Sequence, residues 1–298
     1  MKILNFGSLN LDYIYSVDHF PRPGETLASR ALEVRPGGKG LNQSIALARA
    51  GVEDVFHAGL YGAGGEALPR LLRENGVDTR FLRESEAIQG NAVIEVTPSG
   101  ENRILLFGGS NRAITKEQIA QTLDFFGAGD LLLLQNEVNL LPEIVDRAFE
   151  KGMRIVLNPS PCDEALGAVD FSKLSWLFVN EIEAEALAGS ADPNKAFAAL
   201  HEKYPALSLL VTLGAGGSCA FCVSDSGVER RFEPAAPANA VDTTAAGDTY
   251  TGYFLAALLR GEPLSAAMNL ASRAAALSVS SPGAADSIPL LSHLRCLD

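Results

Sequence analysis

The stretch of sequence best suited to chemistry is a run of small residues that ends in an acid. Residues 242–248 read Asp-Thr-Thr-Ala-Ala-Gly-Asp, and residues 249–259 continue with apolar side chains at helical spacing. The first amide N–H groups of a helix lack partners within it, and the helix dipole is positive there, so this junction can bind an anion. A carboxylate at Asp248 is a poor anion ligand but a good proton acceptor for an attacking hydroxyl. The run predicts phosphoryl transfer to an alcohol. The alternative is that Asp242 or Thr243 merely caps the helix and that Asp248 is a solvated first-turn acid.

A second cluster, rich in glycine, strengthens this interpretation. Residues 36–43 read Pro-Gly-Gly-Lys-Gly-Leu-Asn-Gln and run into an apolar-periodic stretch over residues 44–50. The glycines allow the backbone to approach a ligand closely, while Lys39 and Asn42 carry donors that suit hydroxyl groups. Neither cluster matches the Walker A or the dinucleotide-binding pattern, which argues against a P-loop NTPase and against an NAD enzyme.

Strand-like and helix-like stretches alternate along the chain and indicate how these clusters are positioned. The pattern predicts an α/β fold with a mainly parallel central sheet and helices on both faces. Ligands of such sheets gather at the carboxyl ends of the strands, where Asn158, Asn180 and Thr212 fall. The strand-like runs cover residues 3–6, 55–60, 131–134, 155–157, 176–179 and 209–213, and the helical patterns include 66–74, 142–151, 181–188 and 194–204.

Two further pairs of stretches predict a small antiparallel flap. Residues 13–17 and 27–34 form one pair, and residues 92–97 and 103–107 form the other across the turn-forming residues 98–102. A plain edge hairpin is the alternative.

Composition limits the classes of partner. The chain has 36 acidic and 24 basic residues and a formal net charge of −12. Nucleic acids and anionic membranes require clustered Lys and Arg, so we expect neither as a partner. Because the chain opens without a secretory signal pattern and has no apolar stretch long enough to span a bilayer, we expect a soluble, cytoplasmic protein.

Seven segments, in order along the chain, resemble the ribokinase-type sugar kinases of the PfkB carbohydrate kinase family. Each segment is weak alone, but their common order is specific. The resemblance implies a ribokinase-like fold, with one kinase domain over residues 1–298 and lid strands within about 12–35 and 88–110 that cover the sugar. The lid also implies a homodimer. The matching segments are residues 7–12, 23–26, 37–43, 157–161, 180–185, 212–214 and 241–248.

The resemblance further implies roles around the acceptor sugar. Asp248 matches the family's catalytic base, and the amides of Ala245, Ala246 and Gly247 match its anion hole. A carboxylate that accepts from two vicinal hydroxyls discriminates strongly against analogues that lack one. The residues that match sugar-contacting positions are Asn10, Asp12, Gly38, Lys39, Asn42 and Glu137.

For the nucleotide, the resemblance implies ATP and Mg²⁺. Asn180 and Glu183 match an Asn-x-x-Glu pair that organises Mg²⁺ and its waters, although Glu183 could be a plain helix-surface acid. The loop that approaches the phosphates departs from the family, since Ala215-Gly216 replaces a pair that usually includes Lys or Arg. The residues that match this loop are Thr212, Gly214 and Gly217.

A monovalent-cation site is implied as well. Backbone carbonyls and one carboxylate suit a large, weakly hydrated cation, so we expect K⁺ to activate the enzyme. Ordinary turn chemistry is the alternative for the serines and glycine of this loop. The matching residues are Asp242, Thr244, Ser278, Ser281, Gly283 and Ser287.

The expected reaction is ATP-dependent phosphorylation of a sugar hydroxyl, with D-ribose giving ribose 5-phosphate. One alternative keeps the reaction but uses another sugar, a sugar acid or a nucleoside. A second alternative is a non-catalytic sugar sensor on the same scaffold, which the intact Asp248 and Gly247 disfavour, since a sensor needs no proton acceptor beside an anion hole.

Overall fold

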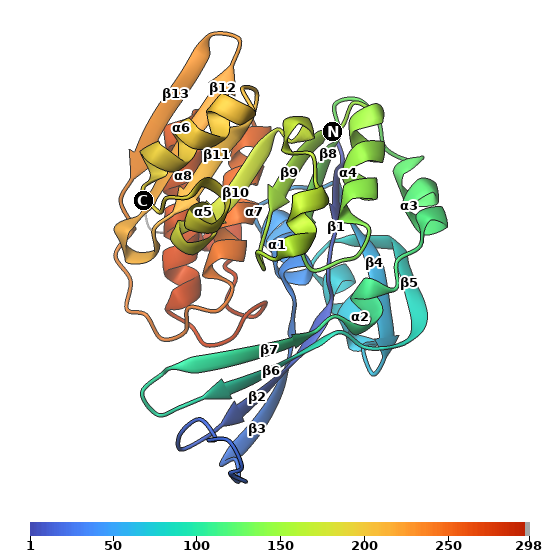
Figure 1. Cartoon of the computed structure of the whole chain (residues 1–298), viewed down its shortest axis with the longest axis vertical. Coiled ribbons are helices and arrows are strands. Elements are labelled where there is room, and N and C mark those ends of the chain that lie inside the picture. The colour runs from blue at the N-terminus through green and yellow to red at the C-terminus, as the bar shows by residue number, and fades with distance from the viewer. Residues whose placement is uncertain (296–298) are drawn as a thin grey trace.

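A nine-stranded sheet forms the body of the protein (Figure 1). The computed structural model describes residues 1–295. The sheet is parallel except at one edge, where the last two strands along the chain pair antiparallel. In order across the sheet, the strands are β13 (Gly227–Glu233), β12 (Ser218–Ser224), β11 (Ser208–Thr212), β10 (Trp176–Asn180), β9 (Arg154–Asn158), β8 (Leu131–Gln135), β1 (Ile3–Phe6), β4 (Val55–Ala63) and β5 (Asp78–Ile88).

Helices cover both faces of this sheet, which confirms the predicted α/β fold. Side chains alternate across a strand, so Leu132 and Leu134 of β8 enter one apolar core while Leu131 and Leu133 enter the other. No helix within residues 1–295 combines the length and apolar character needed to cross a membrane. One face carries α3 (Lys116–Leu123), α4 (Leu141–Glu150), α5 (Glu181–Ala188) and α6 (Pro193–Lys203), and the other carries α1 (Lys39–Arg49), α2 (Ala67–Glu74), α7 (Ala246–Leu259), α8 (Leu264–Val279) and α9 (Leu291–Arg295).

A second, four-stranded sheet projects from the body (Figure 1), and we call it the lid sheet. The predicted hairpin over 92–97 and 103–107 is confirmed, and a parallel pair joins it to the other hairpin. The strand expected at 27–34 begins only at Ala31, after an irregular connection that contains Pro21, Pro23 and the positive-φ residue Gly24. In order, the strands of the lid sheet are β3 (Ala31–Gly37), β2 (Asn10–Ser16), β6 (Asn91–Val96) and β7 (Asn102–Phe107).

Helices α1 and α7 carry the two clusters that could do chemistry, and they pack against each other. A Cβ added at Gly252 of α7 would lie 2.4 Å from the Cβ of Ala46 in α1, so the glycine permits the close approach. The residue that precedes each of these helices has a positive φ. Gly38 precedes α1 with φ 95°, and Ala245 precedes α7 in the left-handed region with φ 60°.

Candidate active site

The first turn of α7 places Asp248 against α1. Asp248 is 7% exposed, and its two carboxylate oxygens accept hydrogen bonds from two neighbouring side chains of α1. The Nδ2 of Asn42 donates at 3.0 Å and the Nε2 of Gln43 donates at 2.8 Å. The two clusters recognised in the sequence are therefore one site. Gln43 belonged to the glycine-rich motif but had no predicted role, and its signal was its place directly beside Asn42.

The backbone amides at the start of α7 were expected to form an anion hole from Ala245, Ala246 and Gly247. Within residues 1–295, the N–H groups of Ala245, Gly247 and Asp248 donate no backbone hydrogen bond. The N–H of Ala246 instead donates to the carbonyl of Thr243 at 3.3 Å. The left-handed conformation of Ala245 turns the chain sharply into the helix, so the free amides face the same space as the carboxylate.

β2 of the lid sheet supplies Asn10 and Asp12, two of the residues expected to contact the sugar. Asn10 is buried, and its Oδ1 accepts from the Nδ2 of Asn111 at 2.7 Å. The carboxylate of Asp12 lies over Gly37, where an added Cβ would be only 2.0 Å from Oδ2. Glycine at position 37 therefore leaves space for the carboxylate of Asp12 that a Cβ would fill.

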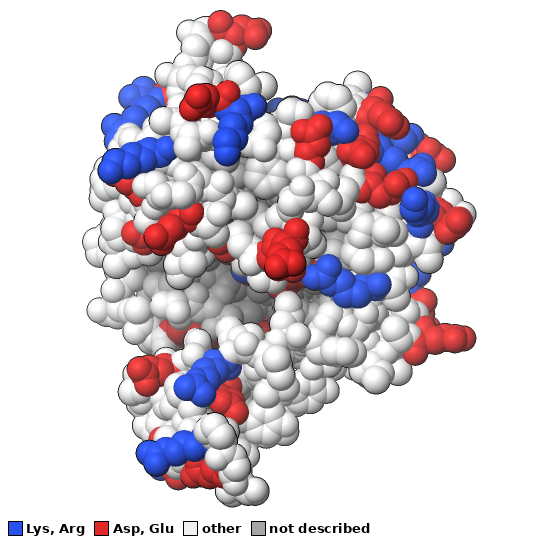
Figure 2. All heavy atoms as spheres, viewed as in Figure 1, with Lys and Arg blue, Asp and Glu red and all other residues white. Residues whose placement is uncertain are grey.

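Glu137 follows β8 and reaches the start of α1. It is 8% exposed, and its Oε2 accepts from the backbone N–H of Lys39 at 3.0 Å and from the hydroxyl of Ser8. A hollow between the body and the lid sheet is visible in Figure 2, with acidic side chains at its edges. A buried carboxylate tied to the helix that holds Asp248 is suited to orient a hydroxyl substrate.

Four carboxylates and one lysine determine the electrostatics of the site. Desolvation, with smaller contributions from Glu137 and Asp248, raises the pKa of Asp12 from 3.8 to about 7. Burial likewise raises the pKa of Glu137, against the opposing effects of Lys39 and Ser8. Burial opposes the charge of Lys39, but the carboxylates of Asp248, Glu137 and Glu183 outweigh it and raise the lysine's pKa above 10.5. Lys39 is therefore a permanent cation at the centre of the site.

Sugar affinity should depend on pH through Asp12. Because its pKa lies near 7, the carboxyl is largely protonated below that pH and accepts fewer hydrogen bonds from a sugar. We expect the Kd of the sugar, measured calorimetrically without nucleotide, to fall as the pH rises from about 6 to about 8. Asp12→Asn should weaken binding at least ~10-fold and remove this pH dependence. A wild-type Kd that is constant over the range would contradict the assignment.

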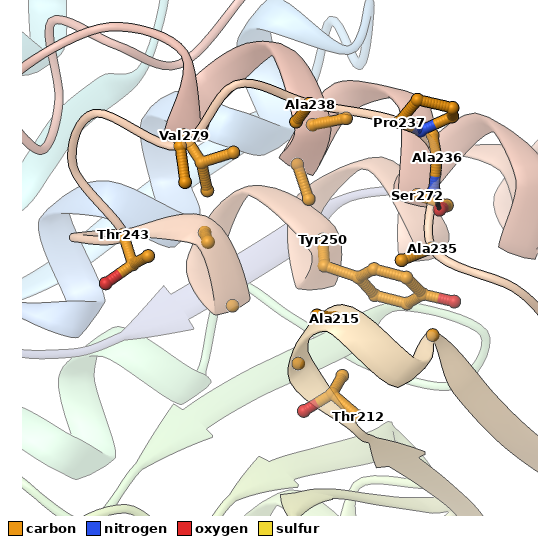
Figure 3. Close-up of a pocket in the computed structure, with 17 residues that line it drawn as sticks. Thr212, Ala215, Ala235, Ala236, Pro237, Ala238, Thr243, Tyr250, Ser272 and Val279 are labelled. Atoms are coloured by element: carbon orange, nitrogen blue, oxygen red, sulfur yellow. Dashed lines mark hydrogen bonds between the residues drawn. The ribbon is translucent and has the colours of Figure 1, made fainter.

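Two cavities meet at the start of α7. The smaller, of about 330 Å³, lies at the carboxyl ends of β10 and β11 and is lined by Lys39, Asn180, Glu183 and Asp248, among others. The larger, of about 480 Å³, has mainly alanine and glycine walls with the ring of Tyr250 on one side (Figure 3). An apolar cavity that opens onto a charged one suits a nucleotide, with its base in the first and its phosphates in the second. The residues that line both cavities are Thr212, Gly214, Thr243 and Gly247.

Two glycines of the loop after β11 were expected near the phosphates, and they differ in their surroundings. Gly214 has φ 53° and open space where a Cβ would lie, so its backbone is accessible from both cavities. Gly217 lines only the larger cavity, and its added Cβ would be 2.1 Å from the carbonyl oxygen of Glu233. Packing against β13 is thus a sufficient reason for glycine at position 217.

A model of the pfkB family of carbohydrate kinases matches residues 1–291. The chain belongs to this family. This pfkB kinase is 36% identical over 299 residues to a ribokinase of Haemophilus influenzae, with 95% of this chain and 94% of the relative covered. It is therefore a phosphotransferase with an alcohol group as acceptor.

Solved structures agree with the family. A ribokinase from Cryptococcus neoformans var. grubii in complex with ADP matches this pfkB kinase with a TM-score of 0.86 and 34% identity, covering 100% of this chain and 99% of that chain. An Arabidopsis thaliana ribokinase complexed with ribose and ATP matches with a TM-score of 0.84 and 25% identity, covering 99% and 98%. The fold of this kinase is the ribokinase fold.

The family implies ATP and Mg²⁺, and the side chains near the smaller cavity fit a water-mediated magnesium site. Asn180 caps α5, where its side chain accepts from the N–H of Glu183 and the Oε2 of Glu183 accepts from the N–H of Asn180. This capping box already accounts for the Asn-x-x-Glu spacing. Residues 1–295 contain no group of three or more acidic, His or Cys side chains placed to hold a metal directly. Mg²⁺ commonly keeps several waters and binds phosphates, so Glu183 would contact its hydration shell.

The residues expected to bind a monovalent cation gather in the loop before α7, in the last turn of α8 and in the loop after α8. The carboxylate of Asp242 accepts from the N–H of Thr244 and from the N–H of Gly283, each at 2.9 Å, which ties the loops together. The hydroxyls of Ser278 and Ser287 bond to each other at 2.9 Å. The N–H of Ser281 donates to the carbonyl of Ser278. The carboxylate keeps lone pairs that fit a cation of low charge density.

Proposed function

We propose that this pfkB kinase transfers the γ-phosphoryl group of ATP to the 5-hydroxyl of D-ribose, giving ribose 5-phosphate. The observation that carries the proposal is the position of Asp248. Its carboxylate lies between Asp12 and Glu137 on one side and the cavities proposed for the nucleotide on the other. The neighbouring backbone amides have no backbone partner. Relatives named ribokinase support the choice of sugar.

In the proposed reaction, Asp248 takes the proton of the sugar hydroxyl as its oxygen attacks the γ-phosphorus. The bond from that phosphorus to the bridging oxygen breaks, and ADP leaves with the bond's electron pair. The amides of Gly247 and Asp248 and the ammonium of Lys39 would stabilise the negative charge of the transferring group. The cation at Lys39 compensates for the phosphate loop, in which Ala215-Gly216 supplies no basic side chain. Bound Mg²⁺ would neutralise phosphate charge and orient the ATP.

The identity of the sugar depends on the contacts at Asn10 and Asp12. A deoxyribokinase from Salmonella typhi is also 30% identical over 308 residues, so the 2-hydroxyl deserves direct comparison. A carboxylate that accepts from two hydroxyls favours ribose over 2-deoxyribose. Sugar acids and nucleosides remain alternatives, and two nucleoside kinases at 18% and 17% identity share the fold.

The test of the proposed function is ADP release with MgCl₂ against ribose, 2-deoxyribose, hexoses, sugar acids and nucleosides, each with and without KCl. We expect ribose to give the highest kcat/KM and KCl to increase it. A higher kcat/KM for 2-deoxyribose or for a nucleoside would name that compound as the substrate instead. Sugar binding without any ADP release would favour the sensor.

We also propose that residues 1–298 act as one kinase domain that pairs with a second copy through the lid sheet. β7 is an edge strand, and unpaired strand edges invite pairing with another chain. Both edge strands of the lid sheet, β7 and β3, also carry exposed apolar side chains that a monomer would leave in water. The exposed apolar residues are Leu32, Val34, Ile104, Leu105, Leu106 and Phe107.

Leu105→Asp should convert the dimer to a monomer, as measured by light scattering, because a buried unpaired carboxylate opposes association. Val228→Asp is the matched control, since Val228 is an exposed apolar residue of β13, the edge strand of the other sheet. A wild-type mass equal to that of one chain, or a dimer lost only in the control, would refute pairing through the lid.

A further inference from the structure

A chain of fully buried side-chain amides runs from Asp248 into the centre of the sheet. The Nε2 of Gln43 donates to Oδ1 of Asp248 at 2.8 Å, and the Oε1 of Gln43 accepts from the Nε2 of Gln135 at 2.6 Å. The same Nε2 of Gln135 donates to the Oδ1 of Asn5 at 3.1 Å. Gln43, Gln135 and Asn5 are each 0% exposed, so water does not compete for these bonds.

The chain continues to a neutral histidine and ends at a carbonyl. The Nδ2 of Asn5 donates to the hydroxyl of Ser44 at 2.9 Å, and that hydroxyl lies 2.8 Å from the Nδ1 of His57. The Nε2 of His57 lies 3.3 Å from the carbonyl oxygen of Gly7. A carbonyl can only accept, so Nε2 carries the proton and Nδ1 accepts from Ser44. Burial lowers the pKa of His57 to about 4, which agrees with a neutral ring.

The amides of this chain have one permitted orientation, which the carboxylate of Asp248 fixes at one end and the carbonyl of Gly40, which accepts from the Nδ2 of Asn5 at 2.8 Å, fixes at the other. An ionised carboxylate only accepts, so Gln43 must turn its NH₂ group toward Asp248 and its oxygen toward Gln135. Gln135 must then present its NH₂ group, which donates to Gln43 in one direction and to Asn5 in the other. The NH₂ group of Gln135 thus starts two series of hydrogen bonds, one that leads through Gln43 to Asp248 and one that leads through Asn5 to Ser44.

We propose that Gln135 is a positioning residue for the catalytic base, which it holds through Gln43 without touching either substrate. The inference rests on the proposed role of Asp248 and extends it. Carboxamides neither gain nor lose protons near neutral pH, so the chain fixes the direction of the carboxylate and is not a path for its proton. The proton that Asp248 takes must therefore leave on the substrate side.

Removing the carboxamide of Gln135 should disorder Gln43 and the base. In Gln135→Leu, the Oε1 of Gln43 loses its donor and faces an apolar side chain, so the amide is no longer held in place against Asp248. We expect kcat to fall ~10- to 100-fold, the size of effect that a misplaced catalytic group produces, while KM for sugar and ATP stays within about twofold. Loss of stability alone would not separate kcat from KM in this way.

Gln118→Leu is the matched control for a lost buried glutamine. Gln118 is 2% exposed, and its Nε2 donates to the carbonyl of Gly59 at 3.0 Å, away from Asp248. We expect Gln118→Leu to lose about as much thermal stability as Gln135→Leu but to keep the wild-type kcat. A kcat of Gln135→Leu within about twofold of wild type, or an equal kcat loss in both variants, would overturn the proposal.

Gln135→Glu supplies a signature in the pH profile that a purely structural role would not give. While protonated, the introduced carboxyl can donate to Gln43, as the native amide does. Once ionised, it can only accept, so Gln43 would turn its NH₂ group away from Asp248. The kcat of this variant should fall as pH rises through the range in which the wild-type kcat is flat or rising. A profile parallel to that of the wild type would count against the proposal.

A measurement without substrate separates this inference from the proposed function. In ¹⁵N-labelled protein, the carboxamide protons of Gln43 should exchange slowly with solvent and lose that protection in Gln135→Leu but not in Gln118→Leu. If this pattern holds while no sugar is phosphorylated, the proposed function fails and the amide chain stands. If the Gln43 protons are unprotected in the wild-type protein, the amide chain itself is refuted.

Discussion

Asp248→Asn should lower kcat for sugar phosphorylation by about 10²- to 10⁴-fold, the usual contribution of a general base. The substitution keeps the shape of the side chain but removes its ability to take a proton. The new NH₂ group would also face the donating amide of Asn42 or Gln43, which now lie 3.0 and 2.8 Å from the two oxygens. We therefore expect a modest additional loss of stability. Binding of ATP, measured by calorimetry, should change little, because the nucleotide contacts are cavity walls and amides.

The control for this prediction is Asp225→Asn in the exposed turn between β12 and β13. It makes the same chemical change far from the anion hole and should leave kcat as it is. A coupled assay of ADP release measures both variants. If Asp248→Asn retains more than about a tenth of the wild-type kcat, the carboxylate is not the base and the proposed mechanism is wrong.

Gly40→Ala should damage both folding and catalysis, although it adds a single methyl group. The added Cβ would lie 2.3 Å from the backbone nitrogen of Ser8 and 2.7 Å from the Cα of Gly7. Backbone atoms cannot rotate away, so α1 or the chain after β1 must shift. Overpacking of this kind costs about 1–3 kcal/mol, and we expect the upper end of that range. The shift would also move Asn42 and Gln43 away from Asp248, so kcat should fall as well.

Gly127→Ala is the appropriate comparison, because Gly127 has no atom within 4 Å of its added Cβ and no positive φ. Thermal unfolding of the two variants measures the difference directly. For a chain of this size, each kcal/mol corresponds to roughly 2–4 °C in Tm. Equal Tm values for the two variants would show that the close approach of Gly40 to Ser8 is not required.

Periodicity was sufficient to predict the parallel sheet, whereas the assignment of Asp248 and the glycine-rich cluster to one sugar site came from the family resemblance. Strands such as β8 are apolar on both faces, and both catalytic clusters precede helices, so each signal was local. β5 was missed, because its mixture of exposed and half-buried residues carries no clear period. The late start of β3 was missed because two prolines interrupt the stretch before it.

The amide chain behind Asp248 could not be predicted, for a different reason. Gln135 and Gln43 are 92 residues apart in sequence, and nothing in either segment indicates the other. Their contact follows from the neighbouring positions of β1 and β8 and from the packing of α1 across them. Likewise, the need for glycine at 217 depends on the return of the chain at Glu233, which the loop sequence does not contain.

The hydrogen bond between Asn42 and Asp248 joins residues 206 apart in the sequence. A ribosome therefore makes β2, the lid sheet and the start of α1 long before it makes Asp248. A chain that has emerged only as far as β13 still lacks α7 and α8, whose apolar side chains share one core with those of α1. Contacts of such long range also form late and slowly in folding. The site is thus completed only when the last third of the chain docks, through α7, onto elements made near its beginning.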